Sequence, residues 1–227
     1  IRFGAAGAKV AVIGRTPEKG DAVVKRITDA GGEAMFVKAE CADETEVKAA
    51  TKTILDTWGR ADILVNTAGG FFDAPALEDV TADGMRENYD WNVIAKFLIT
   101  RELVPTMKAN KYGRIVNISS VAGRTSSAGS IESSTNEAAI IGMTRVLARE
   151  LSDHNVNVNT LMPGYTTTEV DHASMNDDLH EFIQNKRLVK REGTPEDLIG
   201  TALFLASPAS SFISGQTIAV CGGEVMT

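Results

Sequence analysis

The feature that most constrains this chain of 227 residues is the regular alternation of short apolar runs with helical stretches. The apolar runs lie at 8–14, 33–39, 62–70, 113–120, 156–162 and 216–223. The helical stretches lie at 17–32, 43–59, 83–108, 131–152 and 195–206. Near-continuous apolar strands that alternate with helices predict a parallel sheet covered by helices on both faces. We therefore expect a doubly wound α/β fold.

The pattern runs from end to end without a linker or an internal repeat, and the length suits one α/β domain or two small ones. We expect one domain over residues 1–227. In such sheets ligands bind beyond the carboxyl ends of the strands. Glycines, hydroxyls and other small or polar residues follow the predicted strands at 14–16, 40–43, 66–70, 117–120 and 162–168. A polar small-molecule ligand is expected there.

Composition excludes several other classes of protein. A net charge of −7 and a pI of about 5.1 argue against nucleic acid or an anionic membrane surface as the main partner. No apolar run approaches the roughly 20 residues that cross a membrane, and the N-terminus lacks a signal-peptide layout. Cys41 and Cys221 are expected to be free thiols rather than a disulfide, which suits the cytoplasm. The three histidines, His154, His172 and His180, predict no metal site.

Five ordered motifs point to one family. They are "LVNTAGG", "GRIVNISSVAG", "GMTRVLAREL", "NVNTLMPGYTTTE" and "ISGQTIAVCGG". Together they resemble the short-chain dehydrogenase/reductase family over essentially the whole chain. The resemblance implies a Rossmann-type fold, a nicotinamide dinucleotide, and redox chemistry between an alcohol and a carbonyl. It also implies homotetramers or homodimers built through the helices at 83–108 and 131–152.

The same resemblance assigns roles near the reacting atoms. Asn92 matches the asparagine that holds a water in a proton relay, and Ser120 matches the serine that binds the substrate oxygen. Each has a structural alternative. Asn92 can be a buried helix amide that pairs with a carbonyl, and Ser120 can cap the turn after its strand.

Further positions match the family's dinucleotide-binding residues. Asn66, Ala68 and Gly69 match the segment beside the adenine ribose, although Thr67 replaces a second asparagine, and Glu40 stands where an aspartate is common. A second set matches the residues near the nicotinamide: Pro163, Gly164 and Thr168.

Two of these positions also have other interpretations. Arg15 slightly favours NADP over NAD, because a guanidinium can hold a 2′-phosphate, but it can also be a solvated surface arginine. Thr168 can be a helix N-cap ahead of Glu169 and Val170.

The largest departure from the family is at the start of the helix at 131–152. The family signature is a tyrosine thirteen positions after the active serine and a lysine four further on, on one helix face. Here those positions are Ser133 and Glu137. A serine hydroxyl is a far weaker acid than a phenol with a pKa of about 10. A charge at about 4 Å contributes about 4 kcal/mol at an effective dielectric constant of about 20, so changing its sign shifts the local energy by roughly 8 kcal/mol.

Ordinary hydride-transfer chemistry is therefore expected to be absent or very slow. The run "ESSTNE" at 132–137 can be simply a solvated, capped helix start, or a repurposed acid–base site that uses Glu137 and the serines. Three readings remain open: an impaired oxidoreductase, a cofactor-independent lyase, isomerase or dehalogenase-like enzyme, and a non-catalytic partner subunit.

The second departure is at the N-terminus. "IRFGAAGAKV" resembles the end of the family's first helix, so the first strand and the glycine-rich phosphate loop are expected to be missing. Cropping, a partner chain or an altered strand order would account for the gap. Dinucleotide binding should suffer without that loop. Residues 165–190 are expected to form a polar, irregular lid over the substrate.

Overall fold

A computed structural model describes residues 1–70, 75–125, 129–168 and 177–226 of the chain. All the strand pairs in these ranges are parallel, as the sequence predicts. The strands are β1 (Val10–Gly14), β2 (Ala34–Lys38), β3 (Ile63–Asn66), β4 (Gly113–Ile118), β5 (Val156–Pro163) and β6 (Thr217–Val220).

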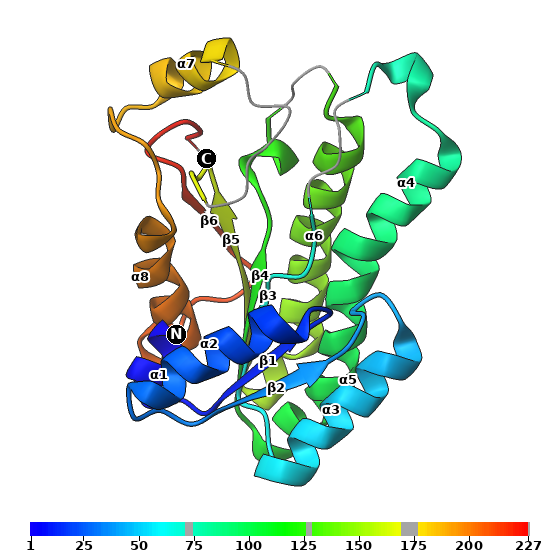
Figure 1. The fold of residues 1–227 in the computed structure, drawn as a ribbon, viewed down its shortest axis with the longest axis vertical. Helices are drawn as coiled ribbons and strands as arrows, with labels where there is room; N and C mark the ends of the chain where they lie inside the picture. Colours follow the sequence, from blue (N-terminus) through cyan, green and yellow to red (C-terminus); the bar gives the residue numbers. More distant parts are fainter. Residues whose placement is uncertain (71–74, 126–128, 169–176, 227) are drawn as a thin grey trace.

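Helices connect these strands and cover them. They are α1 (Arg2–Ala5), α2 (Pro17–Asp29), α3 (Glu44–Trp58), α4 (Ala82–Tyr89), α5 (Ala95–Asn110), α6 (Ile131–Glu150), α7 (Asp177–Lys186) and α8 (Pro195–Ala206). Figure 1 shows α5 and α6 on one side of the strands β3–β6 and α8 on the other. The α/β Rossmann-like architecture expected from the sequence is confirmed. Within the described ranges no helix is both long and apolar enough to span a bilayer.

The sheet is divided into two parts, and a gap of this kind was among the expectations from the sequence. β1 and β2 form a two-stranded sheet, and β3, β4, β5 and β6 form a separate sheet in that order. β1 and β3 both line an open cavity of about 930 Å³. Neither strand has a ladder partner on the side of this cavity among the described residues. The two sheets therefore meet across a space rather than across hydrogen bonds.

The predicted helix at 83–108 is one helical path with a local change of pitch. α4 and α5 are joined by a single π-helical turn, Asp90–Ile94, which contains the buried Asn92. Such wide turns are rare and are frequently found at functional sites.

Two other segments differ from their predicted form. The run 165–190 was expected to be irregular throughout, but α7 occupies Asp177–Lys186. Residues 169–176 of this expected lid lie outside the described residues. Strand β5 also continues through Pro163, because its last pairing is with Val220 on β6.

The main core lies between the four-stranded sheet, α3 and α5. It includes Leu64, Leu103, Ile115 and Val158 among its buried members. A smaller cluster around Leu161 and Leu205 packs α8 on the opposite face. These two layers fix the carboxyl ends of β3, β4 and β5 at one edge, where the predicted site residues lie.

Candidate active site

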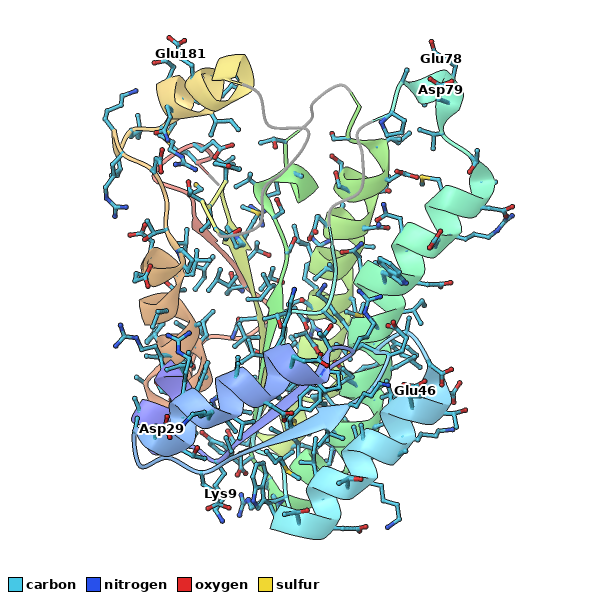
Figure 2. All side chains as sticks on the ribbon, viewed as in Figure 1. Lys9, Asp29, Glu46, Glu78, Asp79 and Glu181 are labelled. Carbon is cyan, nitrogen blue, oxygen red and sulfur yellow. The ribbon has the colours of Figure 1, made fainter. Side chains whose placement is uncertain are left out.

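The loops after β3 and β4 and the start of α6 meet at one end of the four-stranded sheet. Parallel strands place their carboxyl ends at the same edge, so segments distant in sequence converge there. Figure 2 shows the labelled side chains of Glu78, Asp79 and Glu181 pointing outward at this end of the molecule, near α4 and α7.

Asn92 is buried in the π-helical turn and is held from several sides. Its Oδ1 accepts a hydrogen bond from the Gly70 backbone N–H at 3.2 Å, and its Nδ2 donates to Asn88 Oδ1 at 3.0 Å. Gly69 has φ of 142°, and a Cβ atom there would lie 2.4 Å from Asn92 Oδ1. Glycine is therefore required at position 69 so that the loop after β3 can approach Asn92. The structural alternative for Asn92, a satisfied helix amide, fits these contacts.

A chain of hydrogen bonds between buried polar side chains supports the loop after β3. Asn66 Nδ2 donates to Asn117 Oδ1 at 2.8 Å, and Asn117 Nδ2 donates to Thr144 Oγ1 at 2.8 Å. Thr160 continues the chain by donating its hydroxyl to Thr144 Oγ1 at 2.8 Å. These bonds link β3, β4, α6 and β5. The network fixes the position of the site relative to the sheet.

Ser120 follows β4 and caps the next short turn. Its Oγ accepts a hydrogen bond from the Ala122 backbone N–H at 3.2 Å, which is the capping role proposed as an alternative. The neighbouring Ser119 hydroxyl donates to the Glu137 carbonyl oxygen at 3.1 Å. The loop after β4 is thus attached directly to the first turns of α6.

Ser133 and Glu137 occupy successive turns of α6. Ser133 Oγ donates to the Ser130 carbonyl at 3.2 Å, as expected of a helix-start hydroxyl. Position 133 itself carries no tyrosine. Tyr89 is exposed, Tyr112 lies against the Arg114 guanidinium before β4, and the Tyr165 carbonyl accepts a hydrogen bond from Arg187.

Glu137 is largely buried, and its Oε2 has no hydrogen-bond partner. Burial raises the pKa of this carboxyl, and the Lys96 charge and the Ser119 hydroxyl act in the opposite direction. Lys96 is not among the residues that the motifs predict for the site. Its signal in the sequence is a lysine inside the otherwise apolar run "NVIAKFLI", where a charge is unexpected unless it has a partner.

The cavity between the two sheets gathers most of the expected dinucleotide residues. Arg15, Glu40, Asn66, Ala68 and Gly69 all line it. An Arg15 guanidinium nitrogen lies 3.3 Å from Glu40 Oε2, and the guanidinium centre lies 4.7 Å from the ring of Trp91. Arg15 is therefore exposed but paired, rather than simply solvated.

The second expected set lies apart from this cavity, after β5. A Cβ atom at Gly164 would lie 2.8 Å from Cys221 Cβ and 2.8 Å from Glu224 Oε2, so the backbone passes close to the loop after β6. Thr168 is exposed at the limit of the described residues. Pro163 and Gly164 are thus placed at the carboxyl edge of β5. Cys41 and Cys221 are free thiols, as expected.

Comparison with known proteins identifies the family. Residues 1–224 match the sequence profile described as enoyl-(acyl carrier protein) reductase. The chain is 37% identical over 228 residues to a 3-oxoacyl-[acyl-carrier-protein] reductase of Synechocystis sp., with 100% of this chain and 90% of that protein covered. The chain belongs to the short-chain dehydrogenase/reductase family. Another member, the 7alpha-hydroxysteroid dehydrogenase of Escherichia coli, is 31% identical, with 99% of this chain and 88% of that protein covered.

Solved structures of short-chain dehydrogenases/reductases superpose closely on this one. A 7α-hydroxysteroid dehydrogenase in complex with NADH and 7-oxo glycochenodeoxycholic acid has a TM-score of 0.94 at 31% identity, covering 98% of this chain and 87% of that chain. A family member from Mycobacterium ulcerans has a TM-score of 0.93 at 27% identity, covering 98% of this chain and 82% of that chain. The two-sheet arrangement therefore remains close to the family fold.

Proposed function

We propose that this chain is a short-chain dehydrogenase/reductase whose ancestral NAD(P)-dependent alcohol–carbonyl oxidoreduction is absent or strongly impaired. The observation that carries the proposal is the pair Ser133 and Glu137 on successive turns of α6, where the family has tyrosine and lysine. A serine hydroxyl does not release its proton readily enough to serve a carbonyl oxygen at neutral pH.

The residues along the cavity fit the adenosine half of a dinucleotide. Gly69 allows a ligand or a neighbouring group to approach the backbone closely, and Arg15 and Glu40 stand at the ends of β1 and β2. Arg15 slightly favours NADP, since its guanidinium can rotate from Glu40 to a 2′-phosphate.

Titration with NADPH and NADH, followed by nicotinamide fluorescence, tests binding. Reduction of simple ketones with NADPH tests the chemistry. Reduction at ordinary enzyme rates, with kcat of about 1 s⁻¹ or more, would overturn the proposed impairment. The Ser133→Tyr, Glu137→Lys double variant asks whether the two family side chains restore turnover.

A cofactor-independent lyase, isomerase or dehalogenase-like activity is the second candidate. It is favoured by the buried Glu137 carboxyl, whose raised pKa and unpartnered Oε2 suit an acid–base group. Ser120 and Ser133 would bind the ligand oxygen. Glu137→Gln should abolish any such activity, and an unaffected variant would exclude this candidate.

We also propose that the protein is a cytoplasmic homo-oligomer, a dimer or a tetramer, which pairs through α5 and α6. Exposed apolar side chains lie on both helices, at Phe97, Ile131 and Val146. The same faces would serve a non-catalytic subunit that pairs with an active homologue. Light scattering tests the pairing, and a monomer at micromolar concentration would contradict both arrangements.

A further inference from the structure

A buried lysine lies beside the active site on α5, the helix on the same side of the sheet as α6. The Lys96 side chain is on α5, and the residue is 3% exposed. Its Nζ donates to the Asn92 carbonyl oxygen at 2.9 Å and to the Ala68 carbonyl oxygen. An ammonium has three N–H donors, so these two bonds leave one uncommitted. A buried charge of this kind is costly unless another charge compensates it.

Lys96 is part of the site by position. Ala68 belongs to the loop after β3, and Asn92 belongs to the π-helical turn. A Cβ atom at Gly69 would lie 3.3 Å from Lys96 Nζ. The ammonium therefore lies directly beneath the loop that the family resemblance assigns to the dinucleotide.

α6 is linked by hydrogen bonds, through Asn88, to the π-helical turn that contains Asn92. Asn136 Nδ2 donates to Asn88 Oδ1 at 2.6 Å, and Asn92 Nδ2 donates to that same oxygen at 3.0 Å. Glu137 is the next residue along α6, and its Oε2 is buried without a hydrogen-bond partner. Lys96 on α5 and Glu137 on α6 therefore belong to helices that both pack against the π-helical turn, and their charges act on each other.

We propose that Lys96 supplies the cation of this site from α5, in place of the lysine expected at position 137, and keeps Glu137 available as a carboxylate that accepts hydrogen bonds from a ligand's hydroxyl groups. This inference rests on the proposed dinucleotide function for its ligand, a vicinal diol such as a ribose. A hydroxyl group both donates and accepts, so a diol that a lysine binds as an acceptor can equally bind a carboxylate as a donor. Lys96 acts as a positioning residue in this arrangement.

The charges of the two groups act on each other. Burial lowers the pKa of Lys96, and the charges of Glu137 and of the Cys41 thiolate form oppose that change. Burial raises the pKa of Glu137, and Lys96, followed by the Ser119 hydroxyl, opposes that rise. Each group therefore favours the charged form of the other, as in a compensated buried pair.

The first test measures the coupling without any ligand. Carboxyl ¹³C NMR gives the pKa of Glu137 in the wild-type protein and in Lys96→Met, which removes the charge and keeps an unbranched side chain that is one atom shorter. The pKa of Glu137 should rise by about one unit or more in Lys96→Met. It should not change in Lys108→Met, a matched control on the same helix. An equal Glu137 pKa in the wild type and in Lys96→Met overturns the proposal.

A reciprocal measurement covers the case in which Lys96→Met does not fold. In Glu137→Gln the pKa of Lys96, followed by ¹³Cε NMR, should fall by about one unit. An unchanged Lys96 pKa in that variant contradicts the pairing just as directly. Lys96→Arg should restore the wild-type Glu137 titration, because it restores the charge.

The ligand test measures NADP⁺ binding by isothermal titration calorimetry, at pH values below and above the measured pKa of Glu137. Binding should be about tenfold weaker on the acid side, where the carboxyl no longer accepts both hydroxyl protons. Affinity that is the same on both sides overturns the diol assignment. If NADP⁺ does not bind at any pH while the pKa coupling is present, the dinucleotide function fails and Lys96 remains the cation of the site.

The pair also changes how the family signature should be rebuilt. Glu137→Lys alone places a second ammonium beside the buried Lys96, and like charges repel. The Ser133→Tyr, Glu137→Lys variant should therefore have a lower Tm than the same variant that also carries Lys96→Met. An equal or higher Tm without Lys96→Met contradicts the proposed proximity.

Discussion

The strands β1 and β4 are similar apolar runs, but they have very different surroundings in this molecule. β1 reads VAVIG and β4 reads GRIVNI, and both are short runs with apolar β-branched residues. Every residue of β1 is only partly buried, whereas five of the six residues of β4 are fully buried. β4 has a hydrogen-bonded strand on each side, and β1 has β2 on one side and the open cavity on the other.

The difference shows that an apolar run predicts a strand but does not predict how well that strand is packed. The hydrophobic effect stabilises a strand only in proportion to the surface that its neighbours remove from water. β1 and β2 pack against α2, and α3 contacts β2, whereas β4 and β5 lie inside a sheet that packs against α5, α6 and α8. We therefore expect the two-stranded part to be the less stable region of the fold.

Hydrogen exchange should show the largest contrast. Amides of Val116 and Val158 should exchange only through global unfolding, and those of Val12 and Phe36 through local opening. The difference in opening free energy should be on the order of 5 kcal/mol, because local opening can approach zero while global stability is about 5–15 kcal/mol. Exchange measured by NMR or mass spectrometry checks this. Equal protection in β1 and β4 would show that the two sheets unfold as one unit.

The buried amide network should give the next largest effect. Asn117→Ala removes the acceptor for Asn66 Nδ2 and the donor to Thr144, and both partners are buried. Losing these two buried hydrogen bonds should lower the free energy of unfolding by roughly 2 to 3 kcal/mol. Asn66 Nδ2 keeps its bond to Thr100, and Thr144 Oγ1 keeps its bond from Thr160. Urea denaturation measures the change. Asn110→Ala, at the exposed end of α5, is the control and should change stability by less than about 0.5 kcal/mol.

One substitution made in both sheets compares their packing directly. Val158→Ala removes two methyl groups from a completely buried position and should cost about 2 kcal/mol. Val12→Ala makes the same change beside the cavity and should cost less than about 1 kcal/mol, because Val12 is only partly buried. Urea denaturation midpoints, with unchanged m-values, give the loss in the free energy of unfolding for each variant. A larger loss for Val12→Ala would mean that the cavity is closed in solution.

A smaller, pH-dependent effect should come from Glu137. Its folded pKa lies above the unfolded value of about 4.3, so the folded state binds more protons in that window. The free energy of unfolding should therefore fall as the pH rises from about 4 through the folded pKa. In thermal melts taken across this pH range, Glu137→Gln should make the free energy of unfolding depend less on pH. Glu150→Gln, at the exposed end of α6, should leave this pH dependence unchanged.

The smallest effect should come from a surface ion pair on α2. Lys25 Nζ lies 2.8 Å from Asp29 Oδ2, but both side chains are largely exposed. Lys25→Ala should change stability by less than about 0.5 kcal/mol, because solvent and salt screen such pairs. Urea denaturation at low and at high salt checks it. A loss above about 1 kcal/mol would show that α2 stabilises the two-stranded part through charge as well as packing.

Much of the fold could be predicted from local sequence signals. The end of α3 follows from Gly59, whose φ is 74°, and its start follows from Asp43, whose side chain accepts the Glu46 backbone N–H at 2.9 Å. These signals act within a few residues and are visible in the sequence. The order of strands and helices was predictable for the same reason.

A gap in the sheet could be expected from the family resemblance, but the strands that border it and the role of Lys96 were harder to predict. Strand pairing depends on which neighbour is present in space, and the runs of β1 and β3 do not specify it. Lys96 follows Asn92 by one turn, but its carboxylate partner lies forty-one residues further along the chain, on α6. Motif matching assigns roles to positions the family already uses, so it does not examine position 96.

The π-helical turn at Asp90–Ile94 has a consequence for how this protein can evolve. A helix advances about 100° per residue, so losing one residue there would rotate all of α5 by that angle relative to α4. Lys96 would then leave the Ala68 carbonyl, and the apolar stripe of α5 would turn away from the sheet. The number of residues between Asn88 and Lys96 is thus as tightly constrained as their identities. Sequences that drift elsewhere should keep this spacing.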